Sequence, residues 1–298
     1  MHSSTTAPAP PSVACVLVNW NNWQDTAECL ASLALQNYPD LRVIVVDNGS
    51  TNDSLAQLRA AHPWPTYIDT GYNAGFAKGC NIGARHPLAA SADFVWLLNN
   101  DTSAPPETAS RLVAQALAKP RAGVIGAILF YGHDPSRIQA WGGGQVNLWT
   151  GYNWHYTAPV VLGRESYITF ASAFIRRQTF DQLKGLFEGV FMYFEDSDFC
   201  LRAQAAGWQL SVALDTAILH KQGGSIKATR SRRIPHLERT VTLSGLIFLG
   251  RHATVPFISQ TVFVALRLAQ RLLDRDWPAV RAVLLGVRDW RRRTPTDN

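Results

Sequence analysis

The sequence has few cysteines, few charged residues and no long apolar run. Its four cysteines among 298 residues are too scattered for a disulfide framework and form no CxxC pair, which predicts reduced thiols in a cytosolic protein. Charged residues make up only 17% and hydrophobic residues 47%, which excludes an intrinsically disordered chain. No uninterrupted apolar stretch reaches the ~18–20 residues that a membrane span needs.

The N-terminus lacks both the basic and the apolar segment of a secretion signal. Residues 1–12 are rich in Pro, Ser and Thr, which predicts a flexible leader before the folded region. A length of 298 residues suits one large domain with a smaller appendage and excludes a long modular array.

Excess positive charge is missing from most of the chain. Residues 1–219 hold 13 basic and 17 acidic residues, whereas residues 220–298 hold 15 basic and 5 acidic ones. The overall charge of +6 is therefore a property of the last quarter, and it does not indicate a nucleic-acid partner.

Short apolar runs alternate with helical patterns in the first hundred residues. Runs at 13–18, 41–46 and 94–98 predict buried strands of a parallel sheet, with helices at 26–35 and 76–84 between them. This alternation predicts a doubly wound α/β sheet. Other segments predict helices at 54–61, 107–118, 178–184 and 198–206, strands at 66–69, 123–131, 170–176 and 210–219, and a loop or hairpin region at 141–163.

Polar clusters at 19–22, 47–50 and 99–101 each follow a predicted strand. Asn, Asp and Gly are common in ordinary turns, so a single cluster of this kind is not evidence of a site. Open α/β sheets bind ligands at the carboxyl ends of their strands, and three such clusters favour a ligand-binding site. A glycine-rich stretch at 71–81 leads into a helix, where backbone N–H groups can approach a phosphate.

Three carboxylates, Glu195, Asp196 and Asp198, stand within four residues behind an aromatic run. They fit the acidic first turn of a helix, and they equally fit a site where crowding raises the pKa of one member, as a general base requires. His220 ends a predicted strand before a Gly-Ser turn, although a lone histidine is more often structural than a ligand.

Six ordered motifs carry a resemblance to a known family: VLVNWNN (16–22), VVDNGSTNDS (45–54), NAGFAKGCNIGA (73–84), WLLNNDT (96–102), FMYFEDSDFCLRAQAAGW (191–208) and HKQGGS (220–225). They are similar to motifs of the family-2 nucleotide-sugar glycosyltransferases of the GT-A fold, in particular the rhamnosyltransferase-like bacterial branch. The resemblance implies a GT-A type doubly wound, mixed, mostly parallel sheet flanked by helices. The catalytic domain would span 13–235, with a nucleotide-binding half at 13–104 and an acceptor half at 105–235.

The resemblance also implies a donor site, in which Asp47 occupies the position that contacts the base and ribose of the nucleotide. The donor-binding positions of the family are matched by Asn19, Asp47, Ser50, Asn73, Gly75, Phe76, Gly79 and Asn100.

The family's DxD carboxylates hold a divalent cation against the donor diphosphate, and the match here is Asn99-Asn100-Asp101. Only Asp101 keeps a carboxylate at an end of that motif, and His220 falls where the family often supplies a second ligand. The resemblance implies Mg²⁺ or Mn²⁺ held by Asp101 and His220. Positive charge could be shared by Lys221, Lys227 or an arginine of 230–233.

The pair Glu195-Asp196 matches the family's ED motif, whose second carboxylate usually removes the acceptor proton. The resemblance thus implies Asp196 as the base of an inverting displacement, with Glu195 orienting it or binding acceptor. Trp141 and Asp198 are further candidates for acceptor contact. The QxxRW motif of processive members is missing, which favours addition of a single sugar.

Residues 236–298 predict a basic amphipathic helical region. Arg267, Arg271 and Arg275 recur on one helical face. That pattern fits a helix attracted to an anionic membrane surface, and it equally fits the solvated face of a helix packed on the catalytic domain. Peripheral contact with the inner face of the cytoplasmic membrane would suit an acceptor on a polyprenyl diphosphate.

Together these observations predict an inverting, metal-dependent glycosyltransferase of bacterial surface polysaccharide assembly. It would move one sugar, L-rhamnose from dTDP-L-rhamnose by branch resemblance, from a nucleotide-sugar donor to a glycan or polyprenyl-linked acceptor. A UDP-hexose-dependent transferase is the alternative within this class. A nucleotidyltransferase would need a basic GxGxRxxP-like loop after the first strand, which 19–23 lacks. An inactive nucleotide-sugar-binding homologue is favoured by the reduced DxD and opposed by the intact ED pair.

Overall fold

The computed structural model describes residues 9–221 and 230–293. Nine strands form the main sheet of this part of the chain: β1 (Val13–Asn19), β2 (Leu41–Asp47), β3 (Thr66–Asp69), β4 (Phe94–Leu98), β5 (Thr102–Ser103), β6 (Ala122–Tyr131), β7 (Asp134–Trp141), β11 (Ser172–Arg176) and β12 (Gln209–His220). Their order is β3-β2-β1-β4-β11-β6-β12-β5, with β7 paired to β6. The first four strands in this order are parallel, and β11 runs antiparallel to both of its neighbours.

Helices cover both faces of the main sheet because alternate side chains of its buried strands point to opposite faces. Val13, Cys15 and Leu17 of β1 pack with one set of helices, and Ala14 and Val16 pack with the other set. The first set is α1 (Trp23–Ala34), α2 (Ser54–Ala61) and α5 (Thr108–Ala118). The second set is α3 (Phe76–Arg85), α4 (Pro87–Ala90), α6 (Arg177–Gln182) and α7 (Glu195–Ala205).

A small second sheet begins in the region 141–163, which was predicted as a loop or hairpin, and its last strand lies just beyond that region. Its strands are β8 (Gly143–Val146), β9 (Asn153–His155) and β10 (Ser166–Ile168), in the order β10-β8-β9. The strands β5 and β7 were not predicted, because β5 has two residues and β7 has a mixed, largely exposed pattern. Helix α7 begins at Glu195 rather than at the predicted residue 198, so the three clustered carboxylates lie in its first turn.

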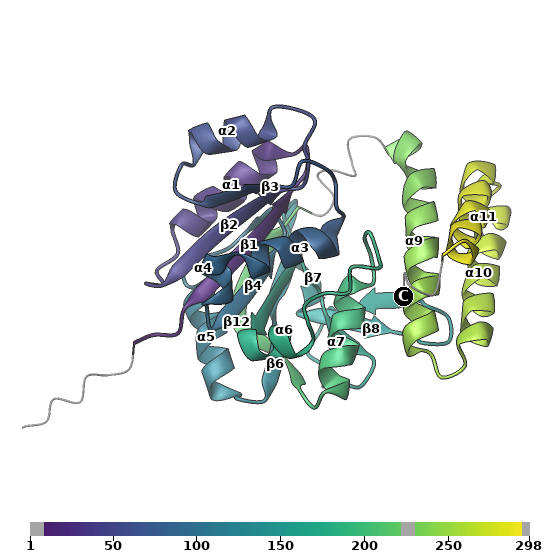
Figure 1. Cartoon of the computed structure of the whole chain (residues 1–298). Helices are drawn as coiled ribbons and strands as arrows, with labels where there is room; N and C mark the ends of the chain where they lie inside the picture. Colours follow the sequence, from purple (N-terminus) through teal and green to yellow (C-terminus); the bar gives the residue numbers. More distant parts are fainter. Residues whose placement is uncertain (1–8, 222–229, 294–298) are drawn as a thin grey trace, which may run out of the picture.

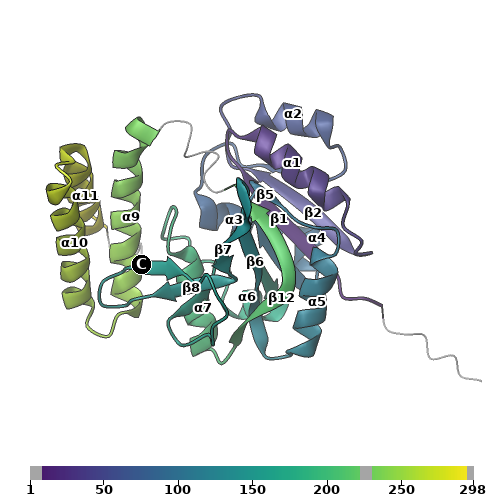
Figure 2. The same ribbon diagram turned by 180° about the vertical axis from the view of Figure 1, so that it is seen from behind.

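Three helices close the described chain: α9 (Arg230–His252), α10 (Pro256–Leu273) and α11 (Trp277–Arg291). They form a layer beside α7 and the small sheet, apart from the main sheet (Figures 1 and 2). Phe194 joins the two parts, because its ring stacks on Phe248 of α9 at 5.0 Å and meets Phe263 of α10 edge-on at 6.4 Å. The boundary predicted between residues 235 and 236 falls inside α9.

The mixed sheet flanked by helices, with helices at the C-terminal end, confirms the predicted fold class. The division of the main sheet into a nucleotide-binding and an acceptor half stays a prediction. None of the helices in the described ranges has both the length and the apolar content that crossing a bilayer requires.

The prediction of an outward-facing arginine stripe on the C-terminal helices is wrong for two of its three members. Arg267 and Arg271 form ion pairs at 2.7 and 2.9 Å with Glu238 of α9, which is only 4% exposed. The reason is that α10 packs on α9 through its basic side, where a buried carboxylate needs positive partners. Arg275 lies beyond the end of α10 and is exposed.

Candidate functional site

Hydrogen bonds hold Asn19, Asp47 and Ser50 together at the ends of β1 and β2. The strand register pairs Asn19 with Asp47, and both side chains are buried. One oxygen of the Asp47 carboxylate accepts hydrogen bonds from Asn19 Nδ2 at 2.7 Å and from Ser50 Oγ at 2.8 Å. The other oxygen accepts from the backbone N–H of Ser50 at 2.9 Å. Strand pairing therefore brings three of the predicted donor-binding residues into one cluster.

The cluster continues to Asn100 through Thr26 of α1. The Thr26 hydroxyl donates to Asn19 Oδ1 at 2.8 Å and accepts from Asn100 Nδ2 at 2.8 Å. A chain of hydrogen bonds thus joins Asp47 to the loop after β4. Thr26 was not predicted as a site residue, because a threonine on an amphipathic helix carries no sequence signal of such a bridge.

Asn48 anchors the glycine-rich loop to the end of β2. Its side-chain Nδ2 donates to Asn73 Oδ1 at 3.0 Å and to the Gly75 carbonyl at 3.1 Å. Its Oδ1 accepts from the backbone N–H of Ala74 at 3.0 Å. This buried asparagine stands next to Asp47 in the sequence, but only the folded chain shows that it holds the predicted donor loop in place.

The same loop lies against the segment that precedes α7. Gly75 has a φ of +84°, and a Cβ atom there would come within 2.5 Å of the Phe191 carbonyl oxygen. The backbone N–H of Phe76 donates to that carbonyl at 2.8 Å. Gly79 allows α3 to approach β1, since a Cβ atom there would lie 3.1 Å from Val18. Glycine is therefore needed at position 75 for both its backbone conformation and its contact.

Pairing of β5 with β12 brings Asp101 beside His220. The His220 Nε2 atom lies 3.1 Å from Asp101 Oδ1, and its Nδ1 atom lies 2.7 Å from Gln139 Oε1 on β7. Because an amide oxygen only accepts, Nδ1 carries the proton in this arrangement. The Nε2 atom and the Asp101 carboxylate oxygen therefore face each other, and both are atom types that coordinate divalent cations.

Asp101 and His220 thus fit a divalent cation as two of its ligands. Within the described ranges, no group of three or more His, Cys, Asp and Glu side chains could hold a metal ion alone. A cation bound here would need further oxygen ligands, which a diphosphate can supply. The alternative Lys221 is paired with Asp25 and Glu28 of α1 at 2.6 Å each. Lys227 lies outside the described residues, as do the last four residues of the HKQGGS motif.

Glu195 and Asp196 differ in exposure and in pKa. Both lie in the first turn of α7, which follows two residues in the left-handed region, Tyr193 and Phe194. Glu195 is 8% exposed, and its Oε2 atom has no hydrogen-bond partner among the described residues. Burial, followed by the charge of Asp196, raises the pKa of Glu195 to about 8. Burial raises the pKa of the partly exposed Asp196 to about 6, although hydrogen bonds from Ser197 oppose the change.

Two residues of the small sheet, Tyr167 and His155, have pKa values that burial shifts. Burial raises the pKa of the Tyr167 phenol, and the charge of Asp196 adds to the effect. The His155 ring lies 6.2 Å from the Tyr167 ring, and its pKa is lowered by desolvation and, further, by His220. Tyr167 of β10 thus has Asp196 and the His155 ring among its neighbours. Neither residue was predicted, because the aromatic-rich region has weak periodicity.

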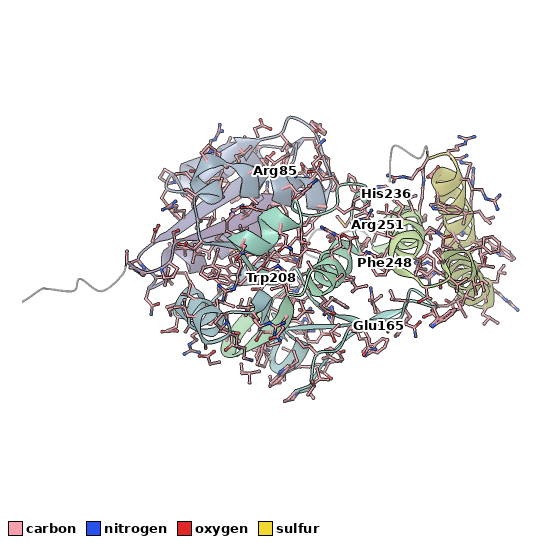
Figure 3. The ribbon with its side chains drawn as sticks, turned by 60° about the horizontal axis from the view of Figure 1, so that its bottom comes forward. Arg85, Glu165, Trp208, His236, Phe248 and Arg251 are labelled. Carbon is pink, nitrogen blue, oxygen red and sulfur yellow. The ribbon has the colours of Figure 1, made fainter. Side chains whose placement is uncertain are left out.

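The Asp198 carboxylate is paired with basic side chains of the protein itself. Its carboxylate contacts Arg202 of α7 at 2.7 Å, and His252 and Arg251 of α9 at 2.8 and 3.1 Å. These partners lower its pKa to about 2 despite its burial, and Figure 3 shows Arg251 on α9. The predicted acceptor contact of Asp198 stays a prediction, and the geometry favours a role in anchoring α9.

Trp141, the other predicted acceptor contact, ends β7 and is half-buried. Its backbone N–H donates to the Tyr156 carbonyl at 2.6 Å, and its side chain packs against the core. It lies two residues after Gln139, which contacts His220. This places Trp141 on the strand that supports His220, while its contact with acceptor stays a prediction.

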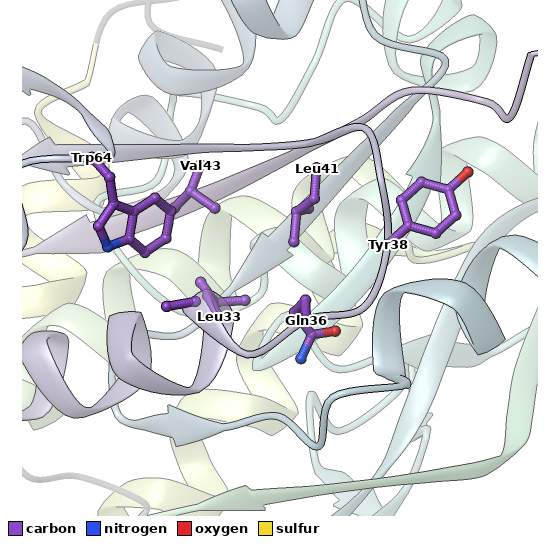
Figure 4. Close-up of a pocket in the computed structure, with 7 residues that line it drawn as sticks. Leu33, Gln36, Tyr38, Leu41, Val43 and Trp64 are labelled. Carbon is purple, nitrogen blue, oxygen red and sulfur yellow. The ribbon is translucent and has the colours of Figure 1, made fainter.

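A pocket of about 300 Å³ lies at the opposite end of β2 (Figure 4). It lies between the end of α1 and the start of β2, where Leu33, Leu41 and Val43 form its apolar lining with Trp64. The polar cluster lies at the other end of the strand, so this pocket is separate from the predicted site.

The mixed sheet flanked by helices has a GT-A-like architecture, which solved structures share. A mannosyltransferase from Pyrobaculum calidifontis, solved with GDP-Man and Mn²⁺, aligns with a TM-score of 0.58 and 19% identity, covering 98% of this chain and 80% of that chain. TarS from S. aureus in complex with UDP-GlcNAc aligns with a TM-score of 0.55 and 15% identity, covering 85% of this chain and 71% of that chain.

Residues 14–184 match the model of glycosyl transferase family 2, and the chain therefore belongs to this family. It is rhamnosyltransferase-like, being 27% identical over 223 residues to the N-acetylglucosaminyl-diphospho-decaprenol L-rhamnosyltransferase of Mycobacterium tuberculosis. That alignment covers 66% of this chain and 71% of the relative. Galactofuranosyltransferase GlfT1 of the same species is 37% identical over 92 residues, which is 30% of each chain.

Proposed function

We propose that this glycosyltransferase moves a single sugar from a nucleotide-sugar donor to a hydroxyl group of a glycan or lipid-linked acceptor, with inversion at the anomeric carbon. The observation that carries the proposal is the pair of carboxylates with raised pKa values at the start of α7, which follows the segment that contacts the glycine-rich loop through Phe191. One partly exposed carboxylate next to a buried one is the arrangement that a general base with a positioning neighbour requires.

The donor is held by the Asp47 cluster and the glycine-rich loop. Asp47, Asn19 and Ser50 would bind the nucleoside, since the second lone pairs of the carboxylate oxygens leave capacity for a ligand hydroxyl. The loop anchored by Asn48 would pack on the donor. The proposed donor-binding residues of this loop are Asn73, Gly75, Phe76 and Gly79, and Asn100 is the proposed donor-binding residue at the DxD position.

Asp196 is the base, and Glu195 is the positioning neighbour. Burial raises the pKa of both carboxyls, and the charge of Asp196 raises that of Glu195 further, so Asp196 is the member of the pair that ionises first. Asp196 therefore removes the proton from the acceptor hydroxyl. The acceptor oxygen forms a bond to the anomeric carbon as the bond to the diphosphate oxygen breaks, and the nucleoside diphosphate leaves with the electron pair.

Asp101 and His220 would hold Mg²⁺ or Mn²⁺ together with oxygens of the donor diphosphate. When bound, the cation supplies positive charge that stabilises the leaving diphosphate. His220 is kept in the correct tautomer for this task by Gln139. The Mn²⁺ in the Pyrobaculum calidifontis structure supports the assignment of a divalent ion.

We propose L-rhamnose from dTDP-L-rhamnose as the transferred sugar, and a polyprenyl-diphosphate glycan as the acceptor, in surface polysaccharide assembly. The similarity to the mycobacterial L-rhamnosyltransferase over 223 residues supports both choices. A UDP-hexose is the second candidate donor, supported by the fold shared with TarS in its UDP-GlcNAc complex. A thermal-shift screen with nucleotide sugars and Mn²⁺ separates the two, because the cognate donor stabilises the protein most.

Asp196→Asn tests the base. The change keeps the size of the side chain but removes its basicity, so transfer should fall by ~10²–10⁴-fold. Donor binding, measured by calorimetry, should stay within about threefold of the wild type because the proposal assigns Asp196 to the acceptor and not to the nucleotide. Transfer that persists within about tenfold would show that another group takes the proton.

A further inference from the structure

The outer face of α10 is apolar and unprotected by the rest of the described chain. Phe257 is 78% exposed and Leu273 is 84% exposed, although they stand at the two ends of the same helix. At 100° per residue, the exposed apolar positions occupy one half of the helix surface, and no charged residue between 257 and 273 falls in that half. We name this face the outer strip: Phe257, Ile258, Leu266, Leu272 and Leu273 of α10, with Trp277 at the start of α11.

The polar side of α10 faces the protein instead. Gln260 is buried and donates to the Leu246 carbonyl of α9 at 2.8 Å. Arg267 and Arg271 pair with the buried Glu238. A helix on the surface of a water-soluble domain normally buries its apolar side, so α10 has the reverse orientation. A contiguous exposed apolar surface of this kind marks a site of association.

Positive charge on the C-terminal helices favours an anionic lipid surface over a second copy of this chain. On α11, the exposed positions Arg281, Arg288, Arg291 and Arg292 fall on the same side as Trp277. A two-fold contact between identical strips would place these arginines near one another with few acidic partners, because residues 220–298 hold 15 basic and 5 acidic residues. Anionic headgroups complement such a surface.

We propose that the outer strip lies in the interfacial layer of an anionic bilayer, with α10 parallel to the membrane plane. Its apolar side chains would enter the acyl boundary, and the arginines of α11 would bind lipid phosphates. Phe263, on the inner side of α10, contacts Phe194, which directly precedes Glu195. The carboxylate pair would therefore stand roughly one helix diameter, ~10 Å, above the bilayer. This inference goes beyond the proposed function, since lipid binding requires no transfer.

Vesicle binding by the full chain tests the proposal. The protein is sedimented with phosphatidylcholine vesicles that contain or lack roughly one third phosphatidylglycerol, at low and at high salt. Wild type should bind the anionic vesicles and bind several-fold less at high salt. Leu266→Ser with Leu273→Ser should reduce the partition coefficient by about tenfold or more, because two apolar side chains are removed from the acyl boundary.

A matched control removes two equally exposed leucines from the catalytic domain. Leu35 and Leu117 are 68% and 57% exposed, close to the 84% and 52% of Leu273 and Leu266. Leu35→Ser with Leu117→Ser should bind vesicles like the wild type, and both double variants should unfold at about the wild-type temperature because the changes are at the surface.

Three results would overturn the proposal. Wild type could remain in the supernatant with anionic vesicles, or both leucine pairs could lose binding equally. Alternatively, light scattering could reveal a dimer that Leu266→Ser with Leu273→Ser dissociates, without vesicle binding, which would make the outer strip a self-association surface. A protein that binds vesicles but transfers no sugar would refute the proposed function and leave this inference standing.

Discussion

Replacing Glu195 with glutamine is expected to stabilise the protein at neutral pH. Glu195 is 8% exposed, and one of its oxygens has no hydrogen-bond partner among the described residues. Burial raises its pKa from the ordinary 4.5 to about 8. Between these two pH values the folded protein holds a proton that the unfolded chain has released, so the free energy of unfolding falls as the pH rises.

The magnitude follows from the same two pKa values. At pH 7 the folded protein must keep a proton on a group that ionises near 4.5 in the unfolded chain, which costs roughly 3 kcal/mol. At pH 5 the cost is below about 1 kcal/mol. Glutamine has nearly the same volume and no charge, so the gain from Glu195→Gln should grow by roughly 2 kcal/mol between pH 5 and pH 7.

Urea denaturation at pH 5, 6 and 7 measures this gain. Glu165→Gln is the control for the loss of one negative charge, because Glu165 lies on a loop at the edge of the small sheet (Figure 3) and should change stability little at any of these pH values. A gain that is equal at pH 5 and pH 7, or a loss at pH 7, would show that Glu195 is ionised in the folded protein. The assignment of Asp196 as the ionised member of the pair would then fail.

Three other changes probe the rest of the site. Asp198→Asn should destabilise the protein by about 3 kcal/mol, because Arg251 and His252 lose a buried carboxylate partner. The pKa of Asp198 is lowered from 3.8 to about 2, so its contribution to the free energy of unfolding is present above pH 3.8 and disappears as the pH falls toward 2. Unchanged urea unfolding at pH 7 would dismiss its role as the anchor of α9. Asn48→Ala should weaken donor binding by roughly tenfold in calorimetry, because it removes three hydrogen bonds that hold the glycine-rich loop. A donor affinity equal to wild type would count against the role of Asn48 in holding this loop. Asp101→Ala should remove the dependence of transfer on a divalent ion, and wild-type activity that is unchanged in EDTA would refute the cation site.

Strand and helix positions in the first hundred residues were predictable because their patterns are local. A buried parallel strand is apolar on both faces, as β1 and β2 are, and the polar residues that follow it must lie at one edge of the sheet. The motif resemblance identified the family for the same reason, since motifs are contiguous in the sequence. The two-residue β5 and the mixed pattern of β7 carried too little local signal to be recognised.

Hydrogen bonds and ion pairs between residues that are distant in the sequence could be seen only in the folded structure. The bridge from Asn19 through Thr26 to Asn100, and the support of His220 by Gln139, join side chains whose sequence contexts are ordinary. The orientation of α10 also depended on tertiary contacts, because its sequence is amphipathic whichever side faces the protein. Arg267 and Arg271 pair with the buried Glu238, so the basic side of α10 faces the protein and its apolar side faces outward. The sequence by itself determined which residue types were available at the edge of the sheet. Packing decided which of these residues contact one another and which face the solvent, because burial and pairing depend on neighbours that are distant along the chain.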